Sequence, residues 1–141
     1  MTGQSGLVLD VVIEDGNPAD TERFIPMLER HIQHYGKVPR QVAADGGYAS
    51  TDNLRQAKEK GVKDVAFHKK KGLKVEDMTK SDWVYRKLRN FRAGIEAGIS
   101  YLKRSFGLGR CRWKGLAHFK ADVWASVVAH NLVTFARLKP A

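Results

Sequence analysis

The sequence contains a single cysteine, Cys111, and no apolar run approaching the roughly 20 residues that a membrane-spanning helix needs. One cysteine excludes an internal disulfide framework and suits a reducing compartment. The first six residues, MTGQSG, are polar and do not resemble a signal peptide. We therefore expect a cytoplasmic protein with no membrane partner.

Acidic residues are scarce in one part of the chain. The formal net charge is +10, from 25 Lys and Arg against 15 Asp and Glu. Between residues 86 and 120, ten bases accompany a single acid, Glu96, so this window holds +9 of the charge. That concentration is typical of a surface that binds a polyanion. A generally basic protein without such a surface is the alternative.

The 141 residues are enough for one domain with a hydrophobic core, and 43% hydrophobic with 28% charged residues is typical of a globular chain. Short apolar, β-branched segments alternate with longer amphipathic ones. They predict strands at residues 7–13, 42–44 and 62–67, with helices at 21–35 and 52–60 between them. This order indicates an α/β fold with parallel strands.

Several residues predict where the first helix begins and ends. Asn17 or Asp20 is expected to cap it, and Gly36 is expected to end it. Pro26 lies inside this helix and should kink or split it.

The second half of the chain is predicted to be helical after a mobile basic loop at about residues 68–80. The bases that open this loop are expected to stay solvated rather than touch a DNA backbone. Helices follow at residues 89–103 and 116–138, and the last is apolar on most of its surface, which predicts burial on both sides. Gly94 and Gly98 cost helix stability, so we expect close packing there against the last helix.

Asp45 is the first candidate for chemistry. It ends a hydrophobic strand and precedes Gly46 and Gly47. In open α/β sheets, functional sites lie outside the carboxyl ends of the strands. The alternative is that Asp45 only forms an Asx-type turn, as aspartates before glycine often do.

Glu96 is the second candidate. On a helical wheel it lies among Arg89, Arg92 and Lys103 along one edge of the apolar stripe. A solvated ladder of salt bridges is the alternative. A strand-end carboxylate and a helical one can jointly hold Mg²⁺, which prefers oxygen ligands, and such ions activate the nucleophile in phosphodiester attack.

Two motifs together resemble the bacterial insertion-sequence transposases of the DDE class: DGGY after a strand, and R-x3-E-x6-K (Arg92, Glu96, Lys103) on a later helix. The stretches ADGGYAS and 83–132 carry the likeness, which implies part of a ribonuclease-H-like fold with a short mixed or parallel sheet and a helical C-terminal part. It implies DNA transposition by metal-dependent hydrolysis and strand transfer. Asp45 matches the second catalytic aspartate and Glu96 the catalytic glutamate, both of them ligands of Mg²⁺ or Mn²⁺.

The resemblance also implies the partners, which are the transposon ends and the target DNA. Arg92 and Lys103 match basic residues near the reacting DNA end. With the other bases of the window, the expected DNA-binding residues are Arg89, Arg92, Lys103, Arg104, Arg110, Arg112 and Lys114. A homo-oligomer or a complex with full-length transposase is a further expected partner.

The sequence departs from the family pattern at two points. Arg89 stands where the signature often has a tyrosine, and the family's first catalytic aspartate lies upstream of the strand matched by residues 7–13, where Asp10 matches a non-catalytic position. We therefore expect residues 1–141 to form a single, truncated catalytic domain that binds metal weakly and is inactive alone. The alternative is a non-catalytic basic remnant that binds DNA and interferes with a full-length transposase.

Overall fold

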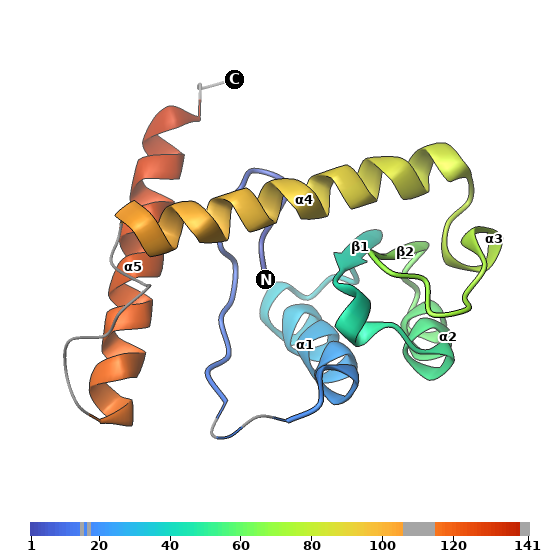
Figure 1. Ribbon diagram of the computed structural model, residues 1–141, viewed down its shortest axis with the longest axis horizontal. Helices are drawn as coiled ribbons and strands as arrows, with labels where there is room; N and C mark the ends of the chain where they lie inside the picture. Colours follow the sequence, from blue (N-terminus) through green and yellow to red (C-terminus); the bar gives the residue numbers. More distant parts are fainter. Residues whose placement is uncertain (15, 17, 106–114, 139–141) are drawn as a thin grey trace. The chain divides into compact units, whose positions relative to one another are not determined.

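The computed structural model describes residues 1–14, 16, 18–105 and 115–138 (Figure 1). The side chains of Glu96, Ile99 and Leu102 lie outside this description. The chain divides into two compact units, one of residues 14–93 and one of residues 1–13 with 94–141.

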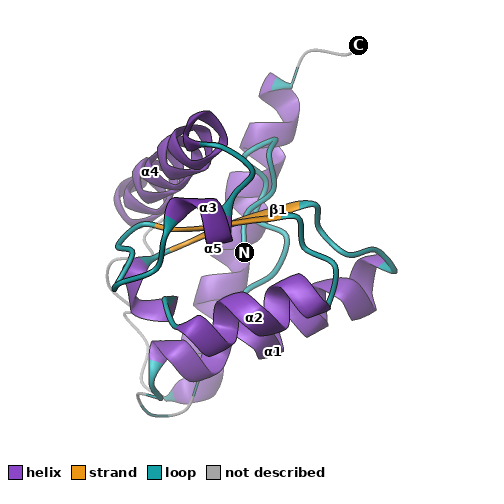
Figure 2. Cartoon of the chain, turned by 90° about the vertical axis from the view of Figure 1, so that its right-hand side faces the viewer, coloured by secondary structure: helices purple, strands orange, loops and turns teal. Residues whose placement is uncertain are grey.

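The unit of residues 14–93 contains a two-stranded sheet. Strand β1 (Gln41–Ala44) pairs in parallel with β2 (Asp64–Phe67), and helix α2 (Thr51–Glu59) connects them. The register pairs Gln41 with Asp64 at one edge and Ala44 with Phe67 at the other. Figure 2 shows helices on both faces of this sheet, α1 and α2 on one and α4 on the other. The predicted α/β class is therefore confirmed, with a small parallel sheet consistent with part of a ribonuclease-H-like fold.

Helix α1 (Asp20–Tyr35) follows its predicted range closely. Gly36 ends it in the left-handed conformation, φ +64°, and donates its N–H to Ile32 O, as expected from a glycine at this position. Pro26 does not split the helix. The predicted cap by Asp20 is wrong, because the N-cap is Ala19 and Asp20 lies inside the first turn. The alternative cap, Asn17, lies outside the described residues.

The core of this unit is built on β2, whose four residues are all buried. Phe67 is fully buried and its ring lies 5.2 Å from that of Phe24 in α1. Tyr85 and Leu88 of helix α4 (Asp82–Ser105) belong to the same cluster, and the Tyr85 hydroxyl donates to Phe67 O at 2.9 Å. A short strand buried on both faces is typical of a parallel sheet covered by helices.

The predicted loop at residues 68–80 is only partly a loop. It contains the short helix α3 (Val75–Met78), and Met78 and Thr79 are buried. Met78 joins the same hydrophobic core as β2. The expectation of a mobile segment throughout is therefore wrong for its second half, because an apolar side chain anchors it.

The strand predicted at residues 7–13 does not form. The segment makes only one isolated antiparallel bridge, between Thr2 and Val8. The side chain of Asn131 takes the place of a neighbouring strand: its Oδ1 accepts from Val8 N and its Nδ2 donates to Val8 O, each at 2.8 Å. Apolar, β-branched composition alone therefore did not make a strand, since a strand also needs a backbone partner.

Helix α5 (Leu116–Arg137) forms the C-terminal part of the second unit. Val123, Val127 and His130 are buried, and the His130 ring lies 6.5 Å from that of Tyr101 in α4. The prediction of burial on both sides is wrong, because the large apolar side chains of its other face are exposed, among them Trp124, Val128, Leu132 and Phe135. No described helix is both long and apolar enough to cross a membrane.

The glycines of α4 do not mark a tight helix contact. Among the residues that the structure describes, a Cβ atom built on Gly94 or Gly98 meets no heavy atom within 4 Å beyond the helix's own backbone. The expected close packing of this face against the last helix is therefore wrong.

Candidate functional site

The turn that follows β1 carries Asp45. Asp45 caps the short 3-10 helix η1 (Gly46–Tyr48), and its Oδ1 accepts the N–H of Gly46 at 2.7 Å. One carboxylate oxygen thus makes the local turn contact of the alternative interpretation. The other oxygen, Oδ2, lies 3.7 Å from Nη2 of Arg92, and the Asp45 side chain is 49% exposed. Asp45 therefore keeps one oxygen directed toward a cation and away from its own backbone.

Both glycines of the DGGY motif have close neighbours. A Cβ on Gly46 would lie 2.6 Å from Cβ of Lys69, which follows β2. A Cβ on Gly47 would collide with the carboxylate of Asp20 from α1. Glycine occurs at turns either because the backbone needs a positive φ or because another group approaches closely. Close approach explains these two positions. It also fixes the turn between α1 and the segment after β2.

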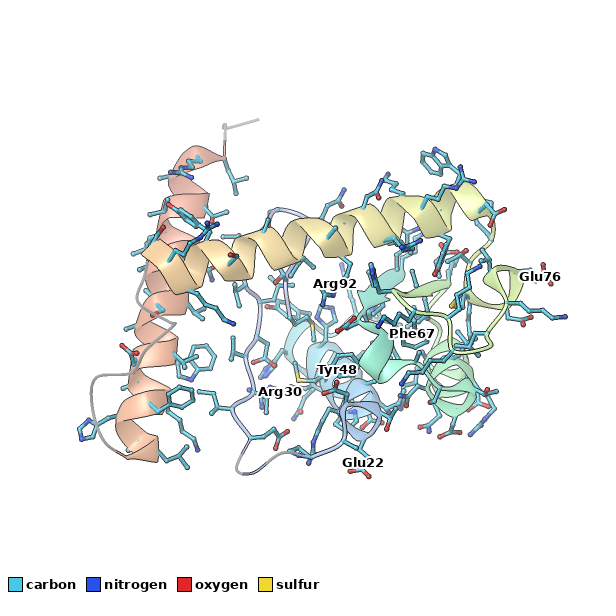
Figure 3. All side chains as sticks on the ribbon, viewed as in Figure 1. Glu22, Arg30, Tyr48, Phe67, Glu76 and Arg92 are labelled. Carbon is cyan, nitrogen blue, oxygen red and sulfur yellow. The ribbon has the colours of Figure 1, made fainter. Side chains whose placement is uncertain are left out.

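Arg92 reaches this turn from α4, and Figure 3 shows it together with Tyr48. Its side chain is only 16% exposed, so its charge is held against the turn rather than in bulk solvent. Burial raises the pKa of the Tyr48 phenol, as do the carboxylates of Asp20 and Asp45, while Arg92 lowers it. Two acids, one arginine and a tyrosine therefore share one electrostatic environment at the carboxyl edge of the sheet.

Asn53 holds the turn in place, a role that the sequence did not suggest. It is buried, and its Nδ2 donates to Tyr48 O and to Thr21 O, both at 2.8 Å. Its backbone N–H is taken by Ser50 Oγ, the N-cap of α2. One amide thus ties η1, α1 and α2 together. No local pattern signals this role, because the partners lie 5 and 32 residues away.

The predicted DNA-binding residues fall into three groups. Arg89 is exposed, and its guanidinium carbon lies 5.8 Å from the centre of the Tyr85 ring. Lys103 and Arg104 are exposed in the second unit, and Arg104 Nε donates to Ser100 O at 3.4 Å. The rest lie outside the described residues: Arg110, Arg112 and Lys114. Of the predicted bases, the structure brings Arg92 into contact with Asp45.

The predicted metal ligands are Asp45 and Glu96. Glu96 lies in α4, and its side chain is outside the described residues. Within the described ranges, no group of three or more His, Cys, Asp or Glu side chains is close enough to hold a metal ion. Asp45 offers the oxygen donor that Mg²⁺ and Mn²⁺ prefer, but Arg92 faces the same carboxylate. The described residues therefore fit a divalent cation only in part.

Comparison with known proteins adds one finding. Residues 1–132 match the family described as the transposase DDE domain. No curated protein and no solved structure matches the chain significantly. The matched range includes the Asp45 turn and the whole of α4.

Proposed function

Because this chain belongs to the transposase DDE-domain family, we propose that it acts in DNA transposition by binding DNA at the carboxyl edge of the β1–β2 sheet. Family membership supports a transposition-related nuclease function and an interaction with DNA. The observation that carries the more specific proposal is the approach of Arg92 Nη2 to Asp45 Oδ2, 3.7 Å apart. It joins the DGGY turn to Arg92, the first residue of the R-x3-E-x6-K motif, and both lie in the unit of residues 14–93.

Arg92 is the proposed phosphate-binding residue of this site. A guanidinium is suited to this because its fork of N–H donors matches the oxygens of a phosphate. At 3.7 Å, its approach to Asp45 is longer than a charge-assisted hydrogen bond, so the two groups neutralise each other without a tight contact.

The proposed acidic residues are Asp45 and Glu96, and the proposed ion is Mg²⁺ or Mn²⁺. When bound, such an ion activates a water or a 3′-hydroxyl for attack on a phosphodiester. Asp45 supports this proposal by its exposure and its strand-end position. The neighbouring cation opposes metal binding at the same carboxylate, so we expect weak affinity for the ion.

Further DNA contacts are proposed for the rest of the basic window, namely Arg89, Lys103, Arg104, Arg110, Arg112 and Lys114. Their charge supports phosphate contacts, which position DNA without reading its sequence. Transposon ends and target DNA are the proposed ligands. Self-association, or association with a full-length transposase, is part of the same proposal.

We propose that the chain by itself binds DNA without cutting it. This is supported by the pairing of Asp45 with Arg92, whose positive charge opposes a metal ion at the same carboxylate. The second candidate function is a non-catalytic DNA-binding module that competes with a full-length transposase. The same ion pair favours it, because the arginine opposes metal binding at the Asp45 carboxylate and supplies a positive charge for a DNA phosphate.

Two substitutions test the proposal. One removes a positive charge from the site and the other removes a negative charge. Arg92→Gln removes a phosphate contact and should weaken binding of a labelled duplex, with the slope of log affinity against log salt falling by about 1. Asp45→Asn removes a carboxylate beside the phosphate and should bind at least as tightly as the parent. If both variants bind like the parent, the DNA site lies elsewhere.

A nicking assay on supercoiled plasmid with Mg²⁺ or Mn²⁺ tests the inactivity of the isolated chain. We expect no metal-dependent nicking by the parent above the level of Asp45→Asn. Nicking by the parent that is lost in Asp45→Asn would contradict this part of the proposal and establish a catalytic role for Asp45.

A further inference from the structure

The segment after β2 lies beside the Asp45 turn. The N–H of His68 donates to Ala44 O at 3.0 Å, which continues the β1–β2 ladder by one step. Lys69 then packs on Gly46, whose absent Cβ would lie 2.6 Å from Lys69 Cβ and 3.1 Å from Lys69 N. The lysine that follows β2 is therefore fixed at the same sheet edge as Asp45.

Tyr85 of α4 gives this edge a platform. Its ring is buried, and its hydroxyl is held by Phe67 O at the end of β2. Lys70 Nζ lies 5.3 Å from the ring centre and Arg89 Cζ lies 5.8 Å from it. Cations at this distance are attracted by the ring's negative face. The Tyr85 ring therefore lies beside two positive groups, Lys70 from the segment after β2 and Arg89 from α4.

A tight turn follows these lysines. Leu73 N–H donates to Lys70 O at 2.9 Å, and the two residues between them, Lys71 and Gly72, have φ values of +44° and +87°. Positive φ at both central positions is the pattern of a type I′ turn. It is unfavourable for a lysine. The chain thus reverses immediately after the basic pair and holds that pair at the sheet edge.

These cations differ from other bases of the same unit in their electrostatic partners. Arg55 pairs with Asp52 and Glu59, and Lys60 pairs with Glu29. Among the described residues, no carboxylate pairs with the three cations at the sheet edge: Lys69, Lys70 and Arg89. Two of these exposed cations, Lys70 and Arg89, lie beside the Tyr85 ring and the third, Lys69, lies beside Gly46, so together they create a positive potential at this edge.

We infer that Lys69, Lys70 and Arg89 form a second phosphate-binding surface, which holds the DNA backbone on the side of the Asp45 turn formed by the segment after β2. This strand-end basic surface rests on the proposed function and deepens it by adding two lysines outside the basic window. Its ligand is a phosphodiester backbone of any sequence, because ammonium and guanidinium groups at fixed positions contact phosphates and not base edges. The DNA strand then lies across the carboxyl ends of β1 and β2, between this surface and Arg92.

The test measures binding of the full chain to a fluorescein-labelled duplex of arbitrary sequence, by anisotropy, between about 50 and 200 mM salt. Lys69→Gln/Lys70→Gln should lower the slope of log affinity against log salt by about 2, or about 1 for each lysine. The charge-matched control is Lys37→Gln/Lys63→Gln. These two exposed lysines precede β1 and β2, at the amino edge of the sheet. The control should keep most of the parent slope.

A second variant, Lys69→Arg/Lys70→Arg, separates charge from folding. It keeps both positive charges and should keep the parent slope, as a surface that acts through phosphate contacts requires. The inference is overturned if Lys69→Gln/Lys70→Gln behaves like the amino-edge control. That result would leave the proposed function intact, provided that Arg92→Gln still reduces the slope. If the parent itself shows no salt-dependent binding, both the inference and the proposed function are overturned.

Discussion

The two edges of the β1–β2 sheet each hold an aspartate near a positive charge, and they use it differently. At the amino edge, Asp64 is buried, and its two oxygens accept from Gln41 Nε2 and Lys80 N, both at 2.9 Å. At the carboxyl edge, Asp45 is half exposed, with one oxygen on Gly46 N and the other 3.7 Å from Arg92. Asp64 is committed to the fold, whereas Asp45 keeps part of its carboxylate at the surface, where we propose that it serves function.

The difference follows from how each carboxylate is satisfied. Burial opposes the charge of Asp64, but the hydrogen bonds from Gln41 and Lys80 and the charges of Lys58 and Lys80 outweigh it and lower its pKa. Removing this buried carboxylate takes the acceptor from both the Gln41 amide and the Lys80 N–H. The Asp45 carboxylate is about half exposed, so water can reach it and replace part of what its removal takes away. The same residue type is therefore fully satisfied inside the fold at one edge and partly exposed at the other.

The largest effect is expected from Asp64→Ala. It leaves the Gln41 amide and the Lys80 N–H without their acceptor and should lower the free energy of unfolding by about 2–3 kcal/mol. Asp45→Ala, the matched substitution at the carboxyl edge, should cost less than about 1 kcal/mol. Urea denaturation at neutral pH measures both. Equal losses for the two variants would remove the distinction between the edges.

Gly46→Ala should have the next largest effect. Its Cβ would lie 2.6 Å from Lys69 Cβ, so the turn or the segment after β2 must move, at a cost of about 1–3 kcal/mol. The control is Gly98→Ala in α4, where a Cβ meets open space. It should raise the free energy of unfolding by up to about 1 kcal/mol. A gain in stability from Gly46→Ala would show that the close approach to Lys69 is absent in solution.

Acidification should reveal Asp64 through its lowered pKa. Because its pKa is lower in the folded protein than in the unfolded chain, its contribution to stability is present above the unfolded value. That contribution is lost as pH falls through the folded value. The parent should therefore lose stability more steeply than Asp64→Asn as pH is lowered below about 4, near the pKa of an unfolded aspartate. Parallel unfolding curves for the two proteins across this range would contradict the assignment.

The smallest effect is expected at Tyr48, whose pKa reports on the carboxyl edge. Arg92→Gln should raise this pKa further, because Arg92 lowers it, and Asp45→Asn should lower it, because Asp45 raises it. The chemical shift of the Tyr48 ring carbon next to the hydroxyl, followed by NMR against pH, measures both variants. Shifts of the same sign in the two variants would show that these charges do not surround the phenol.

The comparison also shows how far the sequence predicts this molecule. Strands β1 and β2, helix α2 and the end of α1 at Gly36 follow from local signals: short apolar runs, a serine cap and a glycine stop. The position of Asp45 at a strand end was predicted in the same way. These features depend on residues that are close neighbours in the chain.

Features that depend on distant partners were not predicted. Residues 7–13 have the composition of a strand, but Asn131, 123 residues further along the chain than Val8, takes the hydrogen bonds that a neighbouring strand would make. The contact between Lys69 and Gly46 was missed for the same reason, although a basic run directly after a strand was a usable signal. Nothing in the sequence indicated the structural role of Asn53, because that role is defined by hydrogen-bond partners elsewhere in the chain.

Amide chemical shifts of the ¹⁵N-labelled chain during titration with duplex DNA test the central claim most directly, because they report on both sheet edges in one experiment. The account predicts changes at Gly46, Gly47 and Tyr48, and none at Asp64 or Lys80. Changes confined to the amino edge, or no change at either edge while the DNA binds, would contradict it.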